Sequence, residues 1–503
     1  MKNKIKVILV VIAVITLVLI IYRIYKMRIE VEKLTLCSIK TYDGQDINDY
    51  INNNRAFKII PKEDGLTIKV NGKEYNKEGI YEPGEYKIEI NKGKRKEKTI
   101  VYINKFNKQK RNEYDLYCIN ATYPLFLVSM DIINNKDNEG ILWFSRYGTL
   151  NIDKIKQINP NIILSEYLNE ETGKRDFDRV NDEMADYVKD VLKKDKNAYF
   201  KLYIDDFLYW FEYPIFEELG ISEDKYEVIM YSDGTLSYTA KYGIMQENAY
   251  DFYNREKDRY KKALYEAKKG MYQFQKLKYL RPSEEGDKTE KLASEYDSNY
   301  ILLATLRDNV TYYLQYPELL TYQDNRVKKE MEKANIKKMS AEEKYKSLSE
   351  ENKKLLNEIL YLDKKYMDKE YFGEDKEKLV ITGANPFYGK YKKEKFEEIL
   401  KYVYKEYGEK YQLLYKPQPK AKPDEEQTKI LERYNIKILP EKLPMEAIMF
   451  IYDNIKLGGF PSTLYMSTSN SDTLFFFEES IEELVEPLNL LYNELFSNSM
   501  LIH

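Results

Sequence analysis

The chain has 503 residues, of which 43% are hydrophobic and 33% charged, so it can bury a large core in several domains of roughly 150 residues each. Its 81 Lys and Arg residues nearly balance its 84 Asp and Glu residues, and the lack of a basic excess argues against a nucleic-acid partner. The only histidine is His503, which excludes Ser-His-Asp and Cys-His catalysis and zinc or haem sites with an internal histidine. Cys37 and Cys118 are too few for a disulfide framework. Any general acid or base must therefore be Asp, Glu, Lys, Tyr or Cys.

The first predicted element is a membrane anchor over residues 7–22, an apolar run with a single threonine and basic residues on both sides. The run is slightly shorter than the ~20 residues of a typical span, and Lys6 and Arg23 can make up the difference by snorkelling. A cleaved signal peptide and a lipoprotein site at Cys37 are the alternatives. Bulky basic residues after the run and Leu36 before the cysteine disfavour them. We expect a single-pass anchor with the bulk of the chain outside, although the flanking charges leave the side of the membrane open.

Residues 35–105 have the alternating pattern of β-strands, seen most clearly at Leu66–Val70 and Tyr86–Ile90. Asn71-Gly72 is a typical hairpin turn between two such strands. We expect a small immunoglobulin-like β domain that serves as a spacer and carries no chemistry. A polar linker should follow at 104–113.

From residue 114 onward, predicted strands alternate with helices, which indicates an α/β fold with parallel sheets. The predicted strands include Tyr226–Tyr231 and Ile455–Gly459, and the predicted helices include Lys393–Tyr407. A second α/β unit begins at the strand Lys378–Thr382, after helical stretches rich in Lys, Glu and Tyr. The expected domains are an N-terminal tail and anchor, the β domain, a first Rossmann-like domain with a helical insert, and a second Rossmann-like domain with a closing helix at 478–497. Their boundaries are 1–34, 35–105, 106–375 and 376–503.

Four short segments follow predicted strands, where open α/β sheets bind their ligands. Asp233, in Tyr231-Ser-Asp-Gly-Thr235, could be partly desolvated and act as a general base. Ser462 and Thr463 follow two glycines and, heading a helix, would suit a phosphate. The other two segments are Ile381-Thr-Gly-Ala384 and Tyr415-Lys-Pro-Gln-Pro419. Taken singly, each also fits an ordinary turn, loop or helix start, and only their order and placement are specific.

In that order the segments resemble the motifs of the bacterial sialyltransferases of glycosyltransferase family 80. The family has an Asp-Gly motif in its first half, then a Thr-Gly strand end, a Lys-Gly-His-Pro loop and a Gly-Gly-x-x-Ser-Ser/Thr-Leu-Tyr segment. The resemblance covers roughly residues 114–500, is strongest from 378 to 478, and implies a GT-B fold of two Rossmann-like domains. The matching segments are Asp233-Gly234, Thr382-Gly383, Lys416-Pro-Gln-Pro419 and Gly458–Tyr465, with Tyr117–Pro124 as the first strand and loop and Glu446 after Leu439-Pro440.

The resemblance implies an inverting, metal-independent transfer of sialic acid from CMP-sialic acid to a galactoside-type glycan. Asp233 would take the proton of the acceptor hydroxyl, Ser462 and Thr463 would hold the donor phosphate, and Glu446 would hold the ribose. The Asp205-Asp206 pair, which could suggest a metal site, is interpreted as structural. The remaining expected donor-binding residues are Thr382, Gly383, Lys416 and Pro419, and the acceptor side comprises Asn120, Asp205, Asp206 and Gly234.

Three positions depart from the family. Gln418 replaces its catalytic histidine, the general acid near the leaving phosphate, and the loss of a general acid typically costs about 10²–10⁴ in rate. Pro417 replaces the loop glycine, and Phe387 stands where some members have tryptophan. Slow transfer is therefore the expectation, with a different nucleotide-sugar donor as one alternative. The other alternative is a catalytically weak or silent glycan-binding surface protein.

Overall fold

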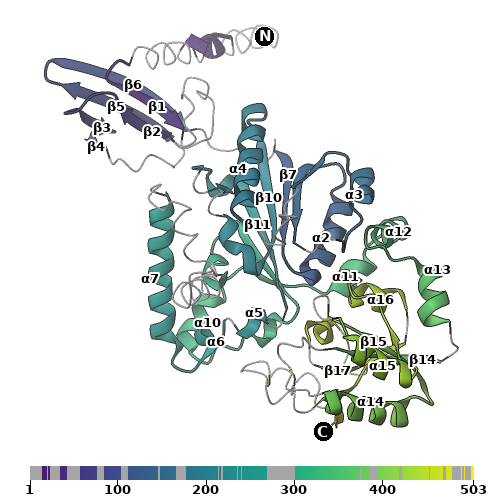
Figure 1. Cartoon of the computed structure of the whole chain (residues 1–503). Coiled ribbons are helices and arrows are strands. Elements are labelled where there is room, and N and C mark those ends of the chain that lie inside the picture. Colours follow the sequence, from purple (N-terminus) through teal and green to yellow (C-terminus); the bar gives the residue numbers. More distant parts are fainter. Residues whose placement is uncertain are drawn as a thin grey trace, which may run out of the picture.

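The computed structural model describes most of the chain. The described residues are 14–19, 21–22, 34–41, 57–75, 84–103, 111–145, 148–165, 177–212, 215–216, 219–234, 236–239, 241–268, 301–373, 376–383, 393–418, 422–452, 454–460, 462–467, 472–477, 489, 492 and 500–502. Two parallel sheets form the two α/β parts of the chain, and a separate all-β region precedes them (Figure 1).

The first α/β part is built on a seven-stranded parallel sheet with the order β13-β12-β11-β10-β7-β8-β9. The chain adds β8 and β9 on one side of β7, then returns and adds β10 to β13 on the other. The loops after β7 and β10 therefore diverge, and such a switch point is where open sheets bind ligands. The strands are β7 (Asn112–Ile119), β8 (Glu139–Phe144), β9 (Ile162–Leu164), β10 (Ala198–Asp205), β11 (Tyr226–Tyr231), β12 (Val310–Leu314) and β13 (Ile336–Lys338).

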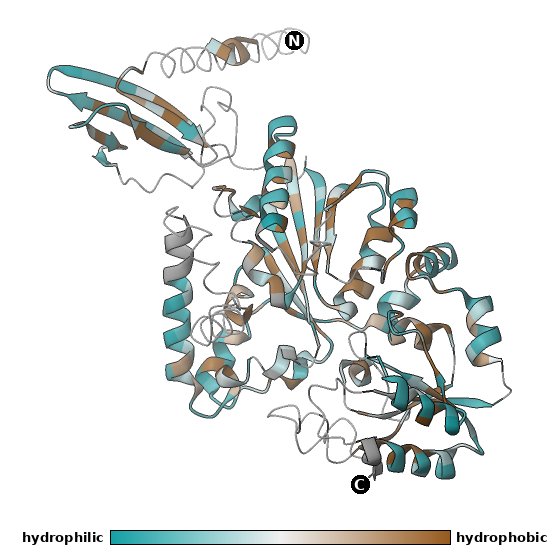
Figure 2. Cartoon of the chain, in the orientation of Figure 1, coloured by the Kyte–Doolittle hydropathy of each residue, from teal (hydrophilic) through white to brown (hydrophobic). Residues whose placement is uncertain are grey.

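Helices cover this sheet because its central strands are buried on both faces, and brown apolar segments recur along these strands in Figure 2. The apolar helix α2 has ten buried residues, whereas α4 is amphipathic and has a polar outer side. The helical elements are α2 (Thr122–Asn134), α3 (Ile152–Ile158), α4 (Phe177–Lys194), η3 (Asp206–Phe211), η5 (Glu223–Lys225), α5 (Leu236–Thr239), α6 (Tyr242–Met245), α7 (Ala249–Lys268), η6 (Pro317–Leu319), α10 (Asn325–Met331), α11 (Ala341–Lys346), α12 (Glu350–Ile359), α13 (Lys364–Met367) and η7 (Asp368–Phe372).

The second α/β part has a six-stranded parallel sheet with the order β16-β15-β14-β17-β18-β19, and its switch point lies between β14 and β17. One apolar cluster contains buried residues of both α/β parts, so the two share a core. The ring of Phe450 lies 6.0 Å from that of Phe126 and 5.5 Å from that of Tyr345. The elements are β14 (Glu377–Thr382), α14 (Lys393–Tyr407), β15 (Tyr411–Lys416), α15 (Glu425–Arg433), β16 (Lys437–Ile438), α16 (Met445–Ile451), β17 (Ile455–Gly459), η8 (Thr463–Ser467), β18 (Thr473–Phe477) and β19 (Met500–Ile502).

The N-terminal β region consists of two antiparallel sheets that share one apolar cluster. The turn at Asn71-Gly72 has positive φ at both residues, as the predicted hairpin requires. The immunoglobulin-like assignment stays a prediction, as do all the domain boundaries. The strands are β1 (Cys37–Thr41), β2 (Phe57–Pro61), β3 (Thr67–Val70), β4 (Lys73–Glu74), β5 (Gly84–Lys92) and β6 (Arg95–Ile103).

Most of the predicted anchor at 7–22 lies outside the described residues, apart from helical residues at 14–19 and 21–22. No helix within the described ranges is both long enough and apolar enough to cross a membrane.

The prediction of an α/β fold with Rossmann-like parallel sheets is confirmed. The helix Lys393–Tyr407 and the strands Tyr226–Tyr231 and Ile455–Gly459 have the predicted bounds. Ser340 and Ser349 cap α11 and α12 by accepting backbone N–H bonds of 3.1 Å. The helix expected after Ser462 is instead a five-residue 3₁₀ turn, η8, because the chain must return quickly to β18. Most of the closing helix expected at 478–497 lies outside the described residues.

Candidate active site

The switch point of the first sheet is held together by a buried carboxylate. Asp205 ends β10, and its Oδ2 accepts backbone N–H bonds from Asn120 and from Ala121, the latter at 3.1 Å. The side chain is fully buried. Burial and the nearby charge of Asp233 raise the pKa of Asp205 well above its usual range. Asp205 therefore fixes the loop after β7.

Asp233 lies in the loop directly after β11, and β11 is the strand that pairs with β10. Its backbone N–H donates to Oδ1 of Asp206 at 3.2 Å. The N–H of Gly234 donates to Oγ of Ser232 at 3.0 Å, and that hydroxyl lies 2.9 Å from Oγ of Ser237. The side chain of Asp233 is half-buried, in contrast to the buried Asp205 and Asp206. Of the three carboxyl groups, that of Asp233 is the one accessible to a substrate.

The switch point of the second sheet brings the two glycine-containing motifs together. Oγ1 of Thr382 donates to the carbonyl of Phe460 at 2.8 Å and lies 2.7 Å from the hydroxyl of Tyr465. Gly459 has a φ of +120°, and a β-carbon there would come within 2.6 Å of the Thr382 carbonyl oxygen. A side chain on Gly383 would collide with the ring of Tyr415. Gly459 is required because the ends of β14 and β17 are in direct backbone contact, and Gly383 because the Tyr415 side chain fills the space beside it.

The two switch points meet where Gly234 contacts Thr463. A β-carbon on Gly234 would lie 2.8 Å from Cβ of Thr463 and closer still to its Oγ1 and Cγ2. Gln315, just after β12, donates from Nε2 to Oγ of Ser467 at 2.8 Å. The turn that carries Asp233 is therefore packed directly against the Ser462-Thr463 segment.

Lys416 and Glu446 are both buried in the second part, and each influences the pKa of the other. Lys416 ends β15 and donates to the carbonyls of Pro417 and Glu441, at 3.0 and 2.8 Å. Burial lowers its pKa to about 8, although the charges of Glu446 and Glu441 oppose the shift. Glu446, in the first turn of α16, is buried, and burial raises its pKa. The site thus holds a cation whose charge depends on pH near neutrality.

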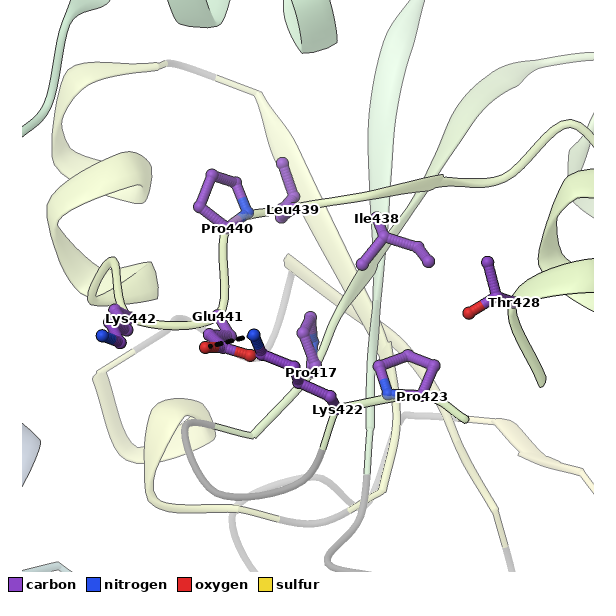
Figure 3. A pocket seen from close by; sticks show the side chains of 9 residues that line it. All are labelled: Pro417, Lys422, Pro423, Thr428, Ile438, Leu439, Pro440, Glu441 and Lys442. Atoms are coloured by element: carbon purple, nitrogen blue, oxygen red, sulfur yellow. Dashed lines mark ion pairs between the residues drawn. The ribbon is translucent and has the colours of Figure 1, made fainter. Parts of the chain in front are cut away.

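A pocket of about 470 Å³ opens beside Lys416, between the ends of β15 and β16. Figure 3 shows Pro417, Pro423, Ile438 and Pro440 around it, and the Lys422–Glu441 ion pair of 3.0 Å at one side. Apolar walls with a few polar groups at the rim suit a flat, partly polar ring. Its lining is Pro417, Lys422, Pro423, Thr428, Ile438, Leu439, Pro440, Glu441 and Lys442.

The predicted residues fall into two groups on the two sheets. Asn120, Asp205, Asp206, Asp233 and Gly234 surround the switch point of the first sheet, and Thr382, Gly383, Lys416, Gln418, Glu446, Ser462 and Thr463 belong to the second part. Gln418 is half-buried just after β15, whereas Pro419 and Phe387 lie outside the described residues. Among the described residues, no group of three or more Asp, Glu, Cys or His side chains is arranged to hold a metal ion.

The sequence analysis missed Tyr123 and Gln315, which belong to the same region. The buried hydroxyl of Tyr123 lies beside Gln315, Ser467 and Glu446. Tyr123 lies within the segment Tyr117–Pro124 that was compared with the family's first strand and loop, so its position in the chain was a usable signal. Gln315 follows a strand that the sequence analysis did not recognise, and nothing in the local sequence distinguishes it.

Known structures share this fold, although no protein-family model and no curated protein sequence matches the chain. An α/β-galactoside α-2,3-sialyltransferase from Photobacterium phosphoreum aligns with a TM-score of 0.58 at 16% identity, over 78% of this chain and 99% of its own. A 2,6-sialyltransferase from Photobacterium sp. JT-ISH-224, in a ternary complex with CMP and lactose, aligns with a TM-score of 0.57 at 16% identity, over 88% and 86%. The GT-B domain of a Photobacterium damselae sialyltransferase aligns at 0.55 and 15%, over 77% and 99%. The chain therefore has the α/β fold of these GT-B proteins.

Proposed function

We propose that the chain is a glycosyltransferase that moves sialic acid from CMP-sialic acid to a galactoside-type glycan. The observation that carries the proposal is the contact between Gly234 and Thr463. It brings a half-buried carboxylate from one sheet to a pair of hydroxyls on the other, within a fold shared with sialyltransferases. An inverting transfer needs this pairing, because the base and the donor phosphate must lie on opposite sides of the reacting carbon.

In this mechanism Asp233 accepts the proton of the acceptor hydroxyl as its oxygen attacks the anomeric carbon, and CMP leaves with the bonding electrons. Ser462 and Thr463 hold the phosphate, and Glu446 accepts hydrogen bonds from the ribose hydroxyls. The pocket beside Pro417 takes the cytosine ring, because its apolar walls and polar rim suit a flat, partly polar ring. Lys416 supplies positive charge near the nucleotide. No step requires a metal.

Gln418 favours a second function, that of a weakly active or silent glycan-binding protein. An amide can donate a hydrogen bond to the leaving phosphate but cannot release a proton to it. The phosphate monoester that leaves has a second pKa of about 6, which lessens the need for an acid. Gln418→His should therefore raise the transfer rate about tenfold or more if Gln418 faces the phosphate. An unchanged rate would show that Gln418 does not face the leaving phosphate.

Nucleotide binding tests the assignment before any acceptor is known. Isothermal titration of the chain with CMP, UMP and UDP should show binding of CMP and at least about tenfold weaker binding of the two uridine nucleotides. A pocket that hydrogen-bonds the amino group of cytosine would reject the carbonyl that uracil has at the same position. Glu446→Gln should lower the affinity for CMP, whereas substitution of the exposed Glu342 by Gln should leave that affinity unchanged. A preference for a uridine nucleotide would assign another donor to the same fold.

We further propose that residues 7–22 anchor the protein in a membrane, and that residues 35–105 form an immunoglobulin-like spacer between the anchor and the enzyme. The basis is the apolar run with basic flanks and the separate core of the β region. Detergent-dependent extraction of the full chain, and its release by deletion of 1–30, would test the anchor. Recovery of the full chain in the aqueous fraction would refute it.

A further inference from the structure

Behind the turn that carries Asp233 lies a buried ionic cluster that the proposed mechanism does not use. Asp206 is 4% exposed, and its two carboxylate oxygens have different partners. Oδ1 accepts the backbone N–H of Asp233 at 3.2 Å. Oδ2 accepts the hydroxyl of Tyr312 at 2.5 Å and lies 3.6 Å from Nζ of Lys241. The cluster joins the end of β10, the loop after β11, and β12.

Lys241 is fully buried, so its charge must be compensated within the protein. Its ammonium group donates to the carbonyl of Ser237 at 2.6 Å and lies 4.9 Å from the centre of the Tyr312 ring. The cation therefore faces a carboxylate, a carbonyl and an aromatic face. Removing the carboxylate alone would leave a buried cation without its counter-charge, which is strongly destabilising.

If Asp206 served only to neutralise Lys241, its second carboxylate oxygen would have no reason to accept a hydrogen bond from the loop after β11. Here one oxygen of Asp206 satisfies Lys241 and Tyr312, and the other remains for the peptide N–H of Asp233. That N–H follows a strand end, where no neighbouring strand supplies its acceptor. Ser232 holds the next N–H, of Gly234, so that two consecutive peptide groups are fixed by side chains. The backbone of Asp233 is thus held from behind while its carboxylate stays accessible.

We propose that Asp206, oriented by Lys241 and Tyr312, is the positioning residue that holds Asp233 in place for proton transfer. This role rests on the proposed function, because it assigns a purpose to the position of the base. Asp206 itself is buried, so it acts through the backbone of Asp233. Its loss should lower kcat and leave donor binding unchanged, since only the placement of Asp233 is affected. A misplacement of about 1 Å costs on the order of a hundredfold in rate.

Two double variants isolate the positioning hydrogen bond. Asp206→Asn with Lys241→Met keeps an acceptor oxygen for Asp233 and removes both charges. Asp206→Leu with Lys241→Met removes the same charges and also the acceptor, with a side chain of the same branching and number of heavy atoms. The measurements are kcat for sialyl transfer, the Kd for CMP, the melting temperature, and hydrogen–deuterium exchange of the peptide that contains Asp233.

We expect the Leu variant to lose about tenfold or more in kcat relative to the Asn variant, with CMP affinities within about twofold and faster exchange at Asp233. Equal kcat values in the two variants would overturn the proposal. A parallel loss of CMP affinity and melting temperature in the Leu variant alone would also overturn it, because the role would then be structural. A wild-type chain without transfer would instead refute the proposed function, and the exchange data would still report whether Asp206 holds the loop.

Discussion

Substituting Gly234 by alanine should disrupt the junction between the two α/β parts, and the structure sets the size of the effect. Gly234 has a φ of +120°, where a β-carbon costs about 1–3 kcal/mol in backbone strain. The same carbon would overlap the side chain of Thr463, with Cβ only 2.8 Å away, and such overpacking costs about another 1–3 kcal/mol. We therefore expect Gly234→Ala to lower the free energy of unfolding by about 2–6 kcal/mol.

A double-mutant cycle separates the two contributions. Thr463→Gly removes the three atoms that the new β-carbon would meet, so it should relieve the overlap and leave the backbone strain. In the double variant, the two changes should show a coupling of about 1–3 kcal/mol in urea unfolding followed by circular dichroism. As a control, alanine at Gly72, which also has positive φ but no neighbour within 4 Å, should show no coupling to Thr463→Gly. Additivity of Gly234→Ala and Thr463→Gly within about 0.5 kcal/mol would refute the contact.

Two further predictions concern pH. Burial raises the pKa of Asp115 to about 6. Between about pH 4 and 6 the folded chain therefore binds more protons than the unfolded chain, and the free energy of unfolding should fall as the pH rises through that window. Asp115→Asn should therefore stabilise the protein at pH 7.5 by up to about 3 kcal/mol and flatten the profile of melting temperature against pH, and an unchanged slope would contradict the assignment. Burial lowers the pKa of Lys416 to about 8, so CMP affinity should fall as the pH rises through about 8, when the ammonium loses its proton. Titration calorimetry of Lys416→Met should show weaker CMP binding without that step, and a step that persists would belong to another group.

The sequence predicted the elements whose pattern is local. The helix Lys393–Tyr407 is amphipathic and the strands Tyr226–Tyr231 and Ile455–Gly459 are apolar, so each could be recognised without its neighbours. The alternation of strands with helices also sufficed to predict parallel sheets, because parallel strands need a crossover connection that is usually a helix.

The contacts between distant segments could not be predicted in this way. No local pattern indicates that Asp206 accepts from Asp233, or that Lys241 and Tyr312 share its other oxygen, since these residues come together only through the strand order. The contact between Gly234 and Thr463 depends likewise on how the two sheets pack. The segment after Ser462 forms a 3₁₀ turn where a helix was expected. The short connection to β18 decides its conformation there and overrides the local helix propensity.

Transfer from CMP-sialic acid to lactose, by the chain and by its Asp233→Ala variant, tests the central claim most directly. CMP release and sialylated lactose would be measured together, with CMP affinity determined for both proteins. The account predicts sialylated lactose from the wild-type chain, and a loss of about a hundredfold or more in the variant at unchanged CMP affinity. Equal transfer by the two proteins would show that the base lies elsewhere. CMP binding without any turnover by the wild-type chain would contradict the assignment as a sialyltransferase for galactosides.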